Sequence, residues 1–197
     1  MYHEQQLGTL CAIHATNNLL GEAAYSCQHF EKIKTDLQLQ DENGRCGNYV
    51  SALPKCCCRR CRQNGGNFDA NVITLALTAR NIELHFWDTR NVDANALLKA
   101  IQDPACEGCL VNTQAASYNF FVGAAIRCIA LCFGKNGHWL AFKKVNDHQF
   151  VDLDSKLKTP KVYDNDNDIE TFLSLHLNKG SYILVAIAVN KETRKTS

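Results

Sequence analysis

Apolar residues in several stretches of the chain recur every three or four positions, a spacing that places them on one face of a helix. The first such stretch runs from Leu10 to Leu20. A residue that can cap a helix lies directly before each of these stretches. The pattern therefore predicts five helices, of which the last ends at Gly180. The predicted N-terminal caps are Thr9, Ser26, Asp69, Asp93 and, for the last helix, Asn167 or Asp168.

Other stretches alternate apolar and polar residues, which is the pattern of strands with one buried face. The clearest are 137–145 and 148–154, and Asn146 and Asp147 between them suit a tight turn, so these two stretches are expected to form a β-hairpin. Further strands are predicted at 82–87, 109–112 and 181–189. Because helices come first and a mostly antiparallel sheet follows, the chain is expected to have an α+β fold in which a helical N-terminal part packs on the sheet.

The apolar stretch from Tyr118 to Phe133 fits either a pair of strands or a helix. It is interrupted by Asn119, Gly123 and Arg127, and it is shorter than the roughly 20 residues that a transmembrane helix needs. A buried core segment is therefore expected, with membrane contact left open as an alternative.

Composition narrows the class of protein. The length of 197 residues, with 46% hydrophobic and 21% charged residues, predicts one globular domain at 1–190 followed by a polar tail at 191–197, and we expect a monomer. The net charge of +1 gives no electrostatic reason to expect nucleic acid as a partner. The odd number of cysteines, eleven, and the lack of a signal-peptide pattern indicate mostly free thiols in a reducing compartment. The expected location is the cytoplasm, with the nucleus as an alternative.

Among these thiols, Cys11 is a candidate nucleophile because it lies in the first turn of the first predicted helix. The free backbone N–H groups and the dipole at the start of a helix favour a thiolate, the form in which cysteine attacks a carbonyl carbon. Gln6 lies five residues earlier and could help to hold the oxyanion that such an attack produces. The site would also need a base and a group that orients the base.

The chain has seven histidines that could serve as the base. Four occupy polar or loop positions and are expected on the surface: His3, His29, His148 and His176. His14 lies three residues after Cys11 on the same helix, whereas a base usually approaches the sulfur from another element. His85 lies within the predicted strand at 82–87 and is expected to be structural. His138 is favoured because it begins the first strand of the predicted hairpin.

The register of that hairpin suggests a partner for His138. If the turn is centred on Asn146, His138 faces Asp154, and a carboxylate beside an imidazole sets its tautomer and stabilises the imidazolium. A turn centred between Asn146 and Asp147 makes Ser155 the partner instead. Without Cys11 nearby, His138 and Asp154 would be read as an ordinary cross-strand polar pair.

Four stretches of the sequence resemble those of a known family: HEQQLGTLCAIHATNNLL from His3, GNFDANVITLAL from Gly66, GHWLAF from Gly137 and FVDLDSKL from Phe150. They occur in the order and with the spacing of Josephin domains, which are papain-like cysteine proteases that act on ubiquitin. The last two are especially similar to the short, single-domain Josephin proteins. The resemblance extends over 2–189, nearly the whole chain, and it implies a papain-like cysteine protease fold.

The resemblance implies four catalytic residues: Cys11 as nucleophile, His138 as general base and acid, Asp154 as the residue that orients His138, and Gln6 as an oxyanion-hole donor beside the backbone N–H of Cys11. The implied reaction is hydrolysis at the C-terminal glycine of ubiquitin through a thioester. It implies ubiquitin and ubiquitinated proteins as partners and no metal or organic cofactor. Longer family members carry asparagine at the third position, whereas Asp154 matches the short members, and either side chain can hold an imidazole.

Three other interpretations stay open. Cys58 and Cys61, with Cys106 and Cys109, form two CxxC pairs that together could bind zinc, although the gap between the pairs is longer than in compact zinc ribbons. A chain of this family could also be a ubiquitin-binding module with little or no catalysis. The triad alone would also be compatible with acyl transfer on another amide, because the catalytic residues do not determine which substrate is bound. The segment Cys46–Cys61 departs from the family pattern, so no substrate contacts are transferred to it.

Overall fold

The computed structural model describes residues 1–6, 10–42, 68–88, 93–113 and 137–189 of the 197-residue chain. The helices in these ranges are α1 (Cys11–Leu20), α2 (Cys27–Glu42), α3 (Ala70–Thr78), α4 (Ala94–Gln102) and α6 (Asp166–Asn178). The strands are β1 (Ile82–Phe86), β2 (Cys106–Asn112), β3 (Trp139–Asn146), β4 (Gln149–Asp152), β5 (Lys161–Tyr163) and β6 (Tyr182–Ala188). None of the helices in the described ranges is long and apolar enough to span a membrane.

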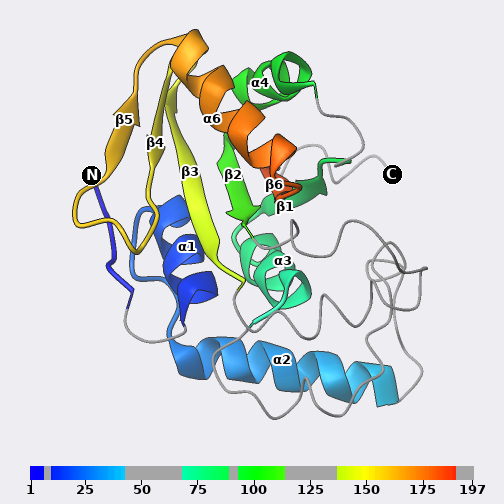
Figure 1. The fold of residues 1–197 in the computed structure, drawn as a ribbon. Coiled ribbons are helices and arrows are strands. Elements are labelled where there is room, and N and C mark those ends of the chain that lie inside the picture. Colours follow the sequence, from blue (N-terminus) through cyan, green and yellow to red (C-terminus); the bar gives the residue numbers. More distant parts are fainter. Residues whose placement is uncertain (7–9, 43–67, 89–92, 114–136, 190–197) are drawn as a thin grey trace.

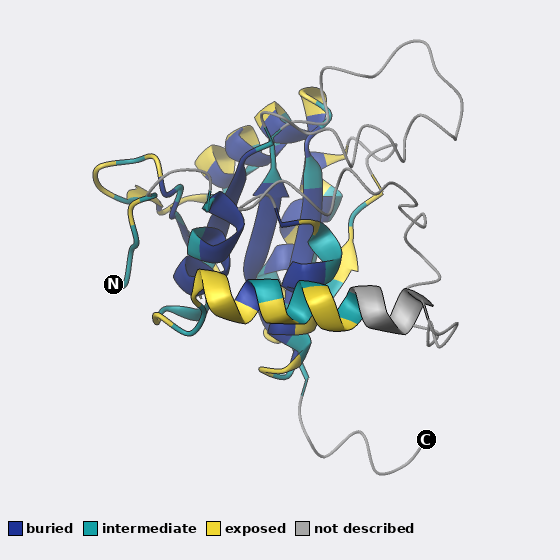
Figure 2. Cartoon of the chain, turned by 90° about the horizontal axis from the view of Figure 1, so that it is seen from below, coloured by how far each residue is buried: buried dark blue, intermediate teal, exposed yellow. Residues whose placement is uncertain are grey.

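The strands of the described ranges form one six-stranded sheet in the order β1-β6-β2-β3-β4-β5, and each neighbouring pair is antiparallel. Helices α1 and α3 pack on one face, with α2 outside them, and α4 and α6 pack on the other (Figure 1). In Figure 2, α2 exposes residues along its outer side while the sheet behind it is buried. The predicted α+β fold, with the N-terminal helices on a mostly antiparallel sheet, is confirmed.

Two apolar cores lie on the two faces of the sheet because side chains alternate along its central strands. Leu110 and Ala141 point into the core under α1 and α3, and their neighbours point into the core under α4 and α6. In the second core, Phe142 stacks on Phe150 and Phe172 with ring centroids 5.2 and 4.2 Å away. A sheet buried on both faces is a rigid base for any site at the end of β3.

The predicted helix caps are mostly confirmed, since Ser26, Asp69 and Asp93 directly precede α2, α3 and α4. The cap of the last helix was predicted wrongly: Asn165, rather than Asn167 or Asp168, accepts the capping hydrogen bond, from the backbone N–H of Asp168 at 2.9 Å. At α1 the cap position is Leu10, which makes no side-chain capping bond, and Thr9 lies outside the described residues.

The predicted strands at 82–87 and 181–189 correspond to β1 and β6. Strand β2 begins three residues earlier than predicted, at Cys106, and the three-residue strand β5 was missed because so short a stretch shows no alternation. The stretch Tyr118–Phe133 and the tail at 191–197 lie outside the described residues, so the domain boundary at 190 stays a prediction.

The predicted β-hairpin is formed by β3 and β4, but its register was predicted wrongly. Asp152 pairs with Phe142, whereas the predicted register places Asp152 opposite Leu140. The physical reason is the position of the turn: Asn146 pairs with Gln149, so Asp147 and His148 form the turn. An irregularity between Lys144 and Asn146 takes back one residue of this shift, which leaves an error of two. Because the error is two residues and side chains alternate, each side chain still faces the predicted side of the sheet.

Candidate active site

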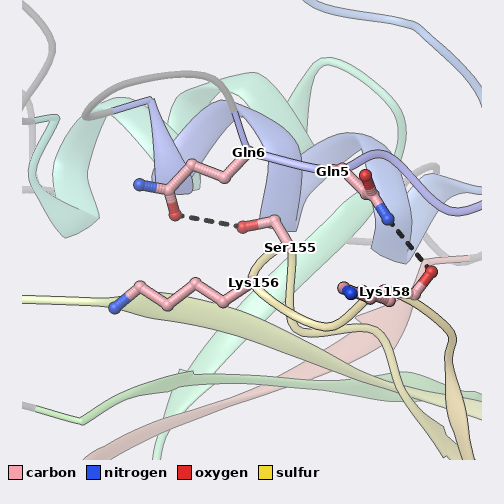
Figure 3. A pocket seen from close by; sticks show the side chains of 5 residues that line it. All are labelled: Gln5, Gln6, Ser155, Lys156 and Lys158. Carbon is pink, nitrogen blue, oxygen red and sulfur yellow. Dashed lines mark hydrogen bonds between the residues drawn. The ribbon is translucent and has the colours of Figure 1, made fainter.

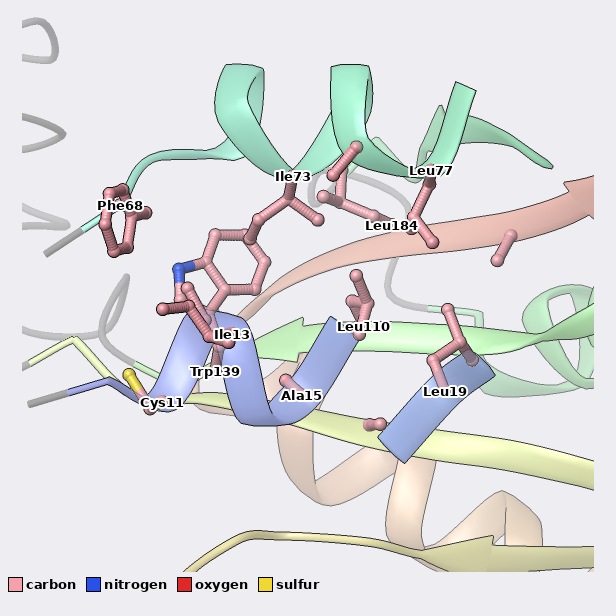
Figure 4. Close-up of a cluster of buried hydrophobic side chains, with 14 of the residues drawn as sticks. Cys11, Ile13, Ala15, Leu19, Phe68, Ile73, Leu77, Leu110, Trp139 and Leu184 are labelled. Carbon is pink, nitrogen blue, oxygen red and sulfur yellow. The ribbon is translucent and has the colours of Figure 1, made fainter. Parts of the chain in front are cut away.

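Cys11 is the first residue of α1, so it lies among the backbone N–H groups that an α-helix leaves without partners at its start. Its side chain is 6% exposed and lies at one end of the core that also holds Ile13 and Trp139 (Figure 4). The Sγ atom is 3.7 Å from the carbonyl oxygen of Gly137. The packing of α1 on β3 therefore places this thiol beside the residue that precedes His138.

His138 lies between Cys11 and Asp154. Its Nε2 atom is 2.5 Å from Oδ1 of Asp154, and the side chain also hydrogen-bonds to Cys11. Because Asp154 occupies Nε2, Nδ1 is the ring nitrogen left for the sulfur. The structure thus brings three of the four predicted site residues together in the order thiol, imidazole, carboxylate.

Asp154 reaches His138 through a turn and not through strand pairing. Strand β4 ends at Asp152, whose Oδ1 accepts the backbone N–H of Asp154 at 2.9 Å. The Oδ1 atom of Asp154 in turn accepts the backbone N–H of Lys156 at 2.8 Å. These two side-chain-to-backbone bonds fold the chain back toward the start of β3, as Asx-turns do. They place the Asp154 carboxylate where it meets the imidazole.

The electrostatics of the three groups favour a charged site. Burial alone would raise the pKa of the Cys11 thiol, but hydrogen bonds from His138 and the backbone of Trp139, with the positive charge of His138, lower it below its ordinary 9.0. Burial alone would lower the pKa of His138, but its hydrogen bonds with Asp154 and Cys11 raise it to about 9. The pKa of Asp154 is lowered against the effect of burial, chiefly by its hydrogen bond with His138. These directions favour the charged forms of the three groups: thiolate, imidazolium and carboxylate.

This charge arrangement predicts the pH dependence of Cys11 alkylation. Iodoacetamide reacts with the thiolate, so the rate at Cys11 should rise with pH and reach half its maximum below pH 9.0. In His138→Ala the sulfur stays buried but loses its cationic partner, so the midpoint should move to higher pH. The modification is measured by mass spectrometry of the peptide that contains Cys11. The exposed Cys27 is the internal reference, with a profile that should be the same in both proteins. An unchanged midpoint at Cys11 would show that His138 does not stabilise the thiolate.

Gln6 is held by the residue that follows Asp154. The backbone N–H of Gln6 donates to the carbonyl oxygen of Ser155 at 2.7 Å, and its side-chain oxygen accepts the Ser155 hydroxyl at 3.3 Å. Together with Gln5, Lys156 and Lys158, these two residues line a surface pocket of about 300 Å³ (Figure 3). Residues 7–9, which connect Gln6 to α1, lie outside the described residues. Gln6 is therefore fixed to the Asp154 turn, on the side of the molecule where the triad lies.

The structure adds Asn18, which sequence reasoning missed. Asn18 is fully buried, and its Oδ1 accepts the backbone N–H of Glu4 at 2.6 Å. Its Nδ2 donates to the carbonyl oxygens of Glu4, at 3.3 Å, and Leu153, at 2.9 Å. One amide on α1 thus holds both the segment that leads to Gln6 and the turn that carries Asp154.

A signal for this contact was present in the sequence. Asn17 and Asn18 are consecutive asparagines in the middle of a helix, where asparagine is unfavourable unless its side chain has a specific partner. Both ends of the Asn17 amide also have partners: Nδ2 donates to the carbonyl oxygen of Tyr25, and Oδ1 accepts the backbone N–H of Tyr25, each at 2.9 Å. His14 on this helix also contacts the N-terminal segment, because its Nδ1 atom is 2.7 Å from Oε2 of Glu4.

Of the four histidines that were expected on the surface, two are exposed, one is half-buried and one is buried. His29 and His148 are exposed, as expected, and His3 is half-buried with Nε2 3.1 Å from the backbone oxygen of Asp154. The prediction for His176 was wrong: it is buried on the inner face of α6, 4.5 Å from the ring of Phe172. Burial, aided by the charge of Lys179, lowers the pKa of His176 to about 4, so this imidazole is neutral at physiological pH.

Of the two CxxC pairs in the zinc hypothesis, only the pair Cys106 and Cys109 lies within the described residues. Cys106 and Cys109 are buried in the core under α4 and α6. Burial raises the pKa of Cys106 to about 11 and the pKa of Cys109 well above 9.0, which favours neutral thiols over the thiolates that zinc binds. Cys58 and Cys61 lie outside the described residues. Within the described part of the chain, no group of three or more His, Cys, Asp or Glu side chains is placed to hold a metal ion.

An α+β fold that aligns a thiol, an imidazole and a carboxylate has the groups that nucleophilic cysteine chemistry requires. The chain belongs to the Josephin family, whose model matches residues 6–187. It is similar to Josephin-2 of Mus musculus, with 29% identity over 195 residues that cover 99% of this chain and 89% of the relative. It is also similar to Josephin-2 of Homo sapiens, with 28% identity over 195 residues that cover 99% of this chain and 89% of the relative. A Josephin-like protein of Drosophila melanogaster is 30% identical over 185 residues, which cover 90% of this chain and 69% of the relative. All four predicted site residues lie within the range that the family model matches.

Proposed function

We propose that this protein is a deubiquitinating cysteine protease, which hydrolyses the bond that joins the C-terminal glycine of ubiquitin to an amine. The observation that carries the proposal is the alignment of Cys11, His138 and Asp154 in a chain of the Josephin family. The proposed roles are nucleophile for Cys11, general base and acid for His138, and orienting group for Asp154.

In the first half of the proposed reaction, the Cys11 thiolate attacks the carbonyl carbon of the C-terminal glycine, and the carbonyl oxygen becomes an oxyanion. Gln6 and the backbone N–H of Cys11 donate hydrogen bonds to that oxygen. The C–N bond then breaks, and His138 gives its proton to the departing amine. Ubiquitin remains attached to Cys11 as a thioester.

In the second half, neutral His138 takes a proton from water, and the resulting hydroxide attacks the thioester carbonyl. A second oxyanion forms and collapses, which releases the C-terminal carboxylic acid of ubiquitin and restores the thiolate–imidazolium pair. The acid then gives its proton to the solvent and becomes a carboxylate. Asp154 keeps the imidazole in one orientation through both halves, because its bond to Nε2 leaves Nδ1 facing the sulfur. The proposed steps use only side chains and backbone groups of the chain itself, and we propose that no metal or organic cofactor takes part.

The arrangement of the elements supports a papain-like fold. The thiol stands at the start of a helix, α1, that packs on an antiparallel sheet, and the imidazole and carboxylate come from β3 and from the turn after β4 on that sheet. We further propose ubiquitin and ubiquitinated proteins as partners, a monomeric state, and a cytoplasmic location with the nucleus as an alternative.

The test is incubation of the full chain with ubiquitin in which a propargylamide replaces the C-terminal glycine, so that the alkyne lies where Cys11 would attack. This electrophile captures a thiolate held at the end of the ubiquitin tail. One covalent adduct is expected, and peptide mapping should place it on Cys11. Turnover of ubiquitin with a fluorogenic amide at its C-terminus should accompany the adduct.

Two variants control this experiment. Cys11→Ala should give no adduct, whereas Cys27→Ala, which removes an exposed thiol at the start of α2, should react like the wild type. An adduct on another cysteine, or none with folded protein, would overturn the proposal. An adduct or a complex without turnover would favour the alternative, a ubiquitin-binding module of the same family.

A further inference from the structure

We propose that Ser155 is a positioning residue that orients the side-chain amide of Gln6 for oxyanion binding, a role that rests on the function proposed above. The Ser155 hydroxyl donates to the Gln6 side-chain oxygen at 3.3 Å. The Ser155 carbonyl oxygen accepts the Gln6 backbone N–H at 2.7 Å. Ser155 is 3% exposed, so water has little access to the hydroxyl that makes the side-chain contact.

The orientation of the amide matters because its two ends have opposite character. The nitrogen end donates hydrogen bonds and stabilises a developing negative charge, whereas the oxygen end accepts them and repels that charge. In Figure 3 the amide oxygen of Gln6 is turned toward Ser155 and the amide nitrogen points away from it. Loss of the Ser155 hydroxyl removes the bond that favours this orientation over the flipped one.

Ser155 also links Gln6 to the rest of the catalytic group. It directly follows Asp154, and that turn is closed by the bond from Leu157 N–H to the Asp154 carbonyl oxygen at 2.9 Å and by the bond from Lys156 N–H to the Asp154 carboxylate. Two consecutive residues therefore serve two functions: Asp154 orients the base, and Ser155 orients the oxyanion donor. A single turn sets the relative positions of both.

The experiment compares two reactions of Cys11 that differ in one respect. Acylation by p-nitrophenyl acetate passes through a tetrahedral oxyanion, whereas alkylation by iodoacetamide is a direct displacement at carbon that forms none. In Ser155→Ala the acylation rate should fall about tenfold, a fraction of the 10²- to 10³-fold loss typical when an oxyanion donor is removed altogether. The alkylation rate should not change. Both rates are followed on the Cys11 peptide by rapid quenching and mass spectrometry.

Two further variants separate positioning from general damage. Ser155→Thr keeps a hydroxyl at the same place and should restore acylation. In a Gln6→Ala background, Ser155→Ala should have no further effect, because the amide that it orients is gone.

A fall in both reactions, or no fall in acylation, would overturn the proposal, as would full additivity of the two substitutions. Neither reaction uses ubiquitin, so these results do not depend on the substrate assignment. If ubiquitin turnover fails while acylation still depends on Ser155 through Gln6, the assignment of ubiquitin is wrong and the role of Ser155 stands.

Discussion

Replacement of His138 by alanine is expected to lower turnover of a ubiquitin amide by about 10⁴-fold or more, the range seen when a member of a catalytic triad is removed. Two losses coincide in this variant. Cys11 remains buried but no longer has the cation that lowers its pKa, so less of it is thiolate at neutral pH. The departing amine also loses its proton donor. The measurement is kcat/KM at neutral pH on ubiquitin with a fluorogenic amide at its C-terminus.

The matched control for this prediction is His148→Ala. His148 lies in the turn of the same hairpin but is exposed, and it pairs with Asp166 at 3.0 Å on the surface. Its replacement should leave kcat/KM within about twofold of the wild type, as expected for a surface site. Circular dichroism checks that both variants are folded. A His138→Ala protein with turnover within tenfold of the wild type would mean that another group is the base.

Cys11 and His138 could be found from the sequence because each marks the start of an element with a strong local pattern. The helix spacing from Leu10 to Leu20 places Cys11 in a first turn, and the alternation from Gly137 onward places His138 at the start of a strand. Helix and strand periodicity are local properties, and local properties are what a single sequence records best.

The contact between Asp154 and His138 was predicted from a register that the structure does not have. The expected cross-strand pair required a turn centred on Asn146, but the observed register would place Lys156 opposite His138 if the ladder continued. The ladder ends at Asp152 instead, and the Asp152 and Asp154 side chains bond to backbone N–H groups to form a turn. Such bonds fix where the carboxylate lies, and the alternation of apolar and polar residues does not predict them.

The partners of Ser155 and Asn18 could not be predicted from local patterns for a related reason. Both act through hydrogen bonds between segments about 135 to 150 residues apart in the chain. Ser155 was considered only as a cross-strand partner of His138. The mid-helix position of Asn18 indicates a specific partner, but it does not say which segments of the chain supply that partner. The same limit applies to His176, whose burial depends on the packing of α6 on the sheet and not on its own polarity.

Replacement of Asn18 by leucine is expected to destabilise the protein by on the order of 3 kcal/mol, because it leaves buried backbone groups without the amide that satisfies them. Leucine has the same number of side-chain heavy atoms as asparagine, with the same branching, so the shape of the side chain is largely kept. The Glu4 N–H and the Leu153 carbonyl oxygen, however, both lose a partner inside the molecule. Urea unfolding followed by circular dichroism measures the change in the free energy of unfolding.

The same substitution should also lower activity in conditions where the variant is fully folded. Asn18 ties the segment before Gln6 and the turn before Asp154 to the helix that carries Cys11, so its loss should loosen the geometry of all three. Small displacements of catalytic groups are costly, and kcat should fall more than KM rises.

The control is Asn178→Leu, which makes the same chemical change at an exposed position at the end of α6 and should alter neither stability nor turnover appreciably. If Asn18→Leu unfolds at the same urea concentration as the wild type, the buried amide does not hold these segments. If it is less stable but fully active when folded, Asn18 supports the fold alone, and the catalytic geometry is fixed by the Ser155 and Asp154 turn. The two measurements together therefore decide whether the polar side of α1 stabilises only the domain or also the arrangement of its site.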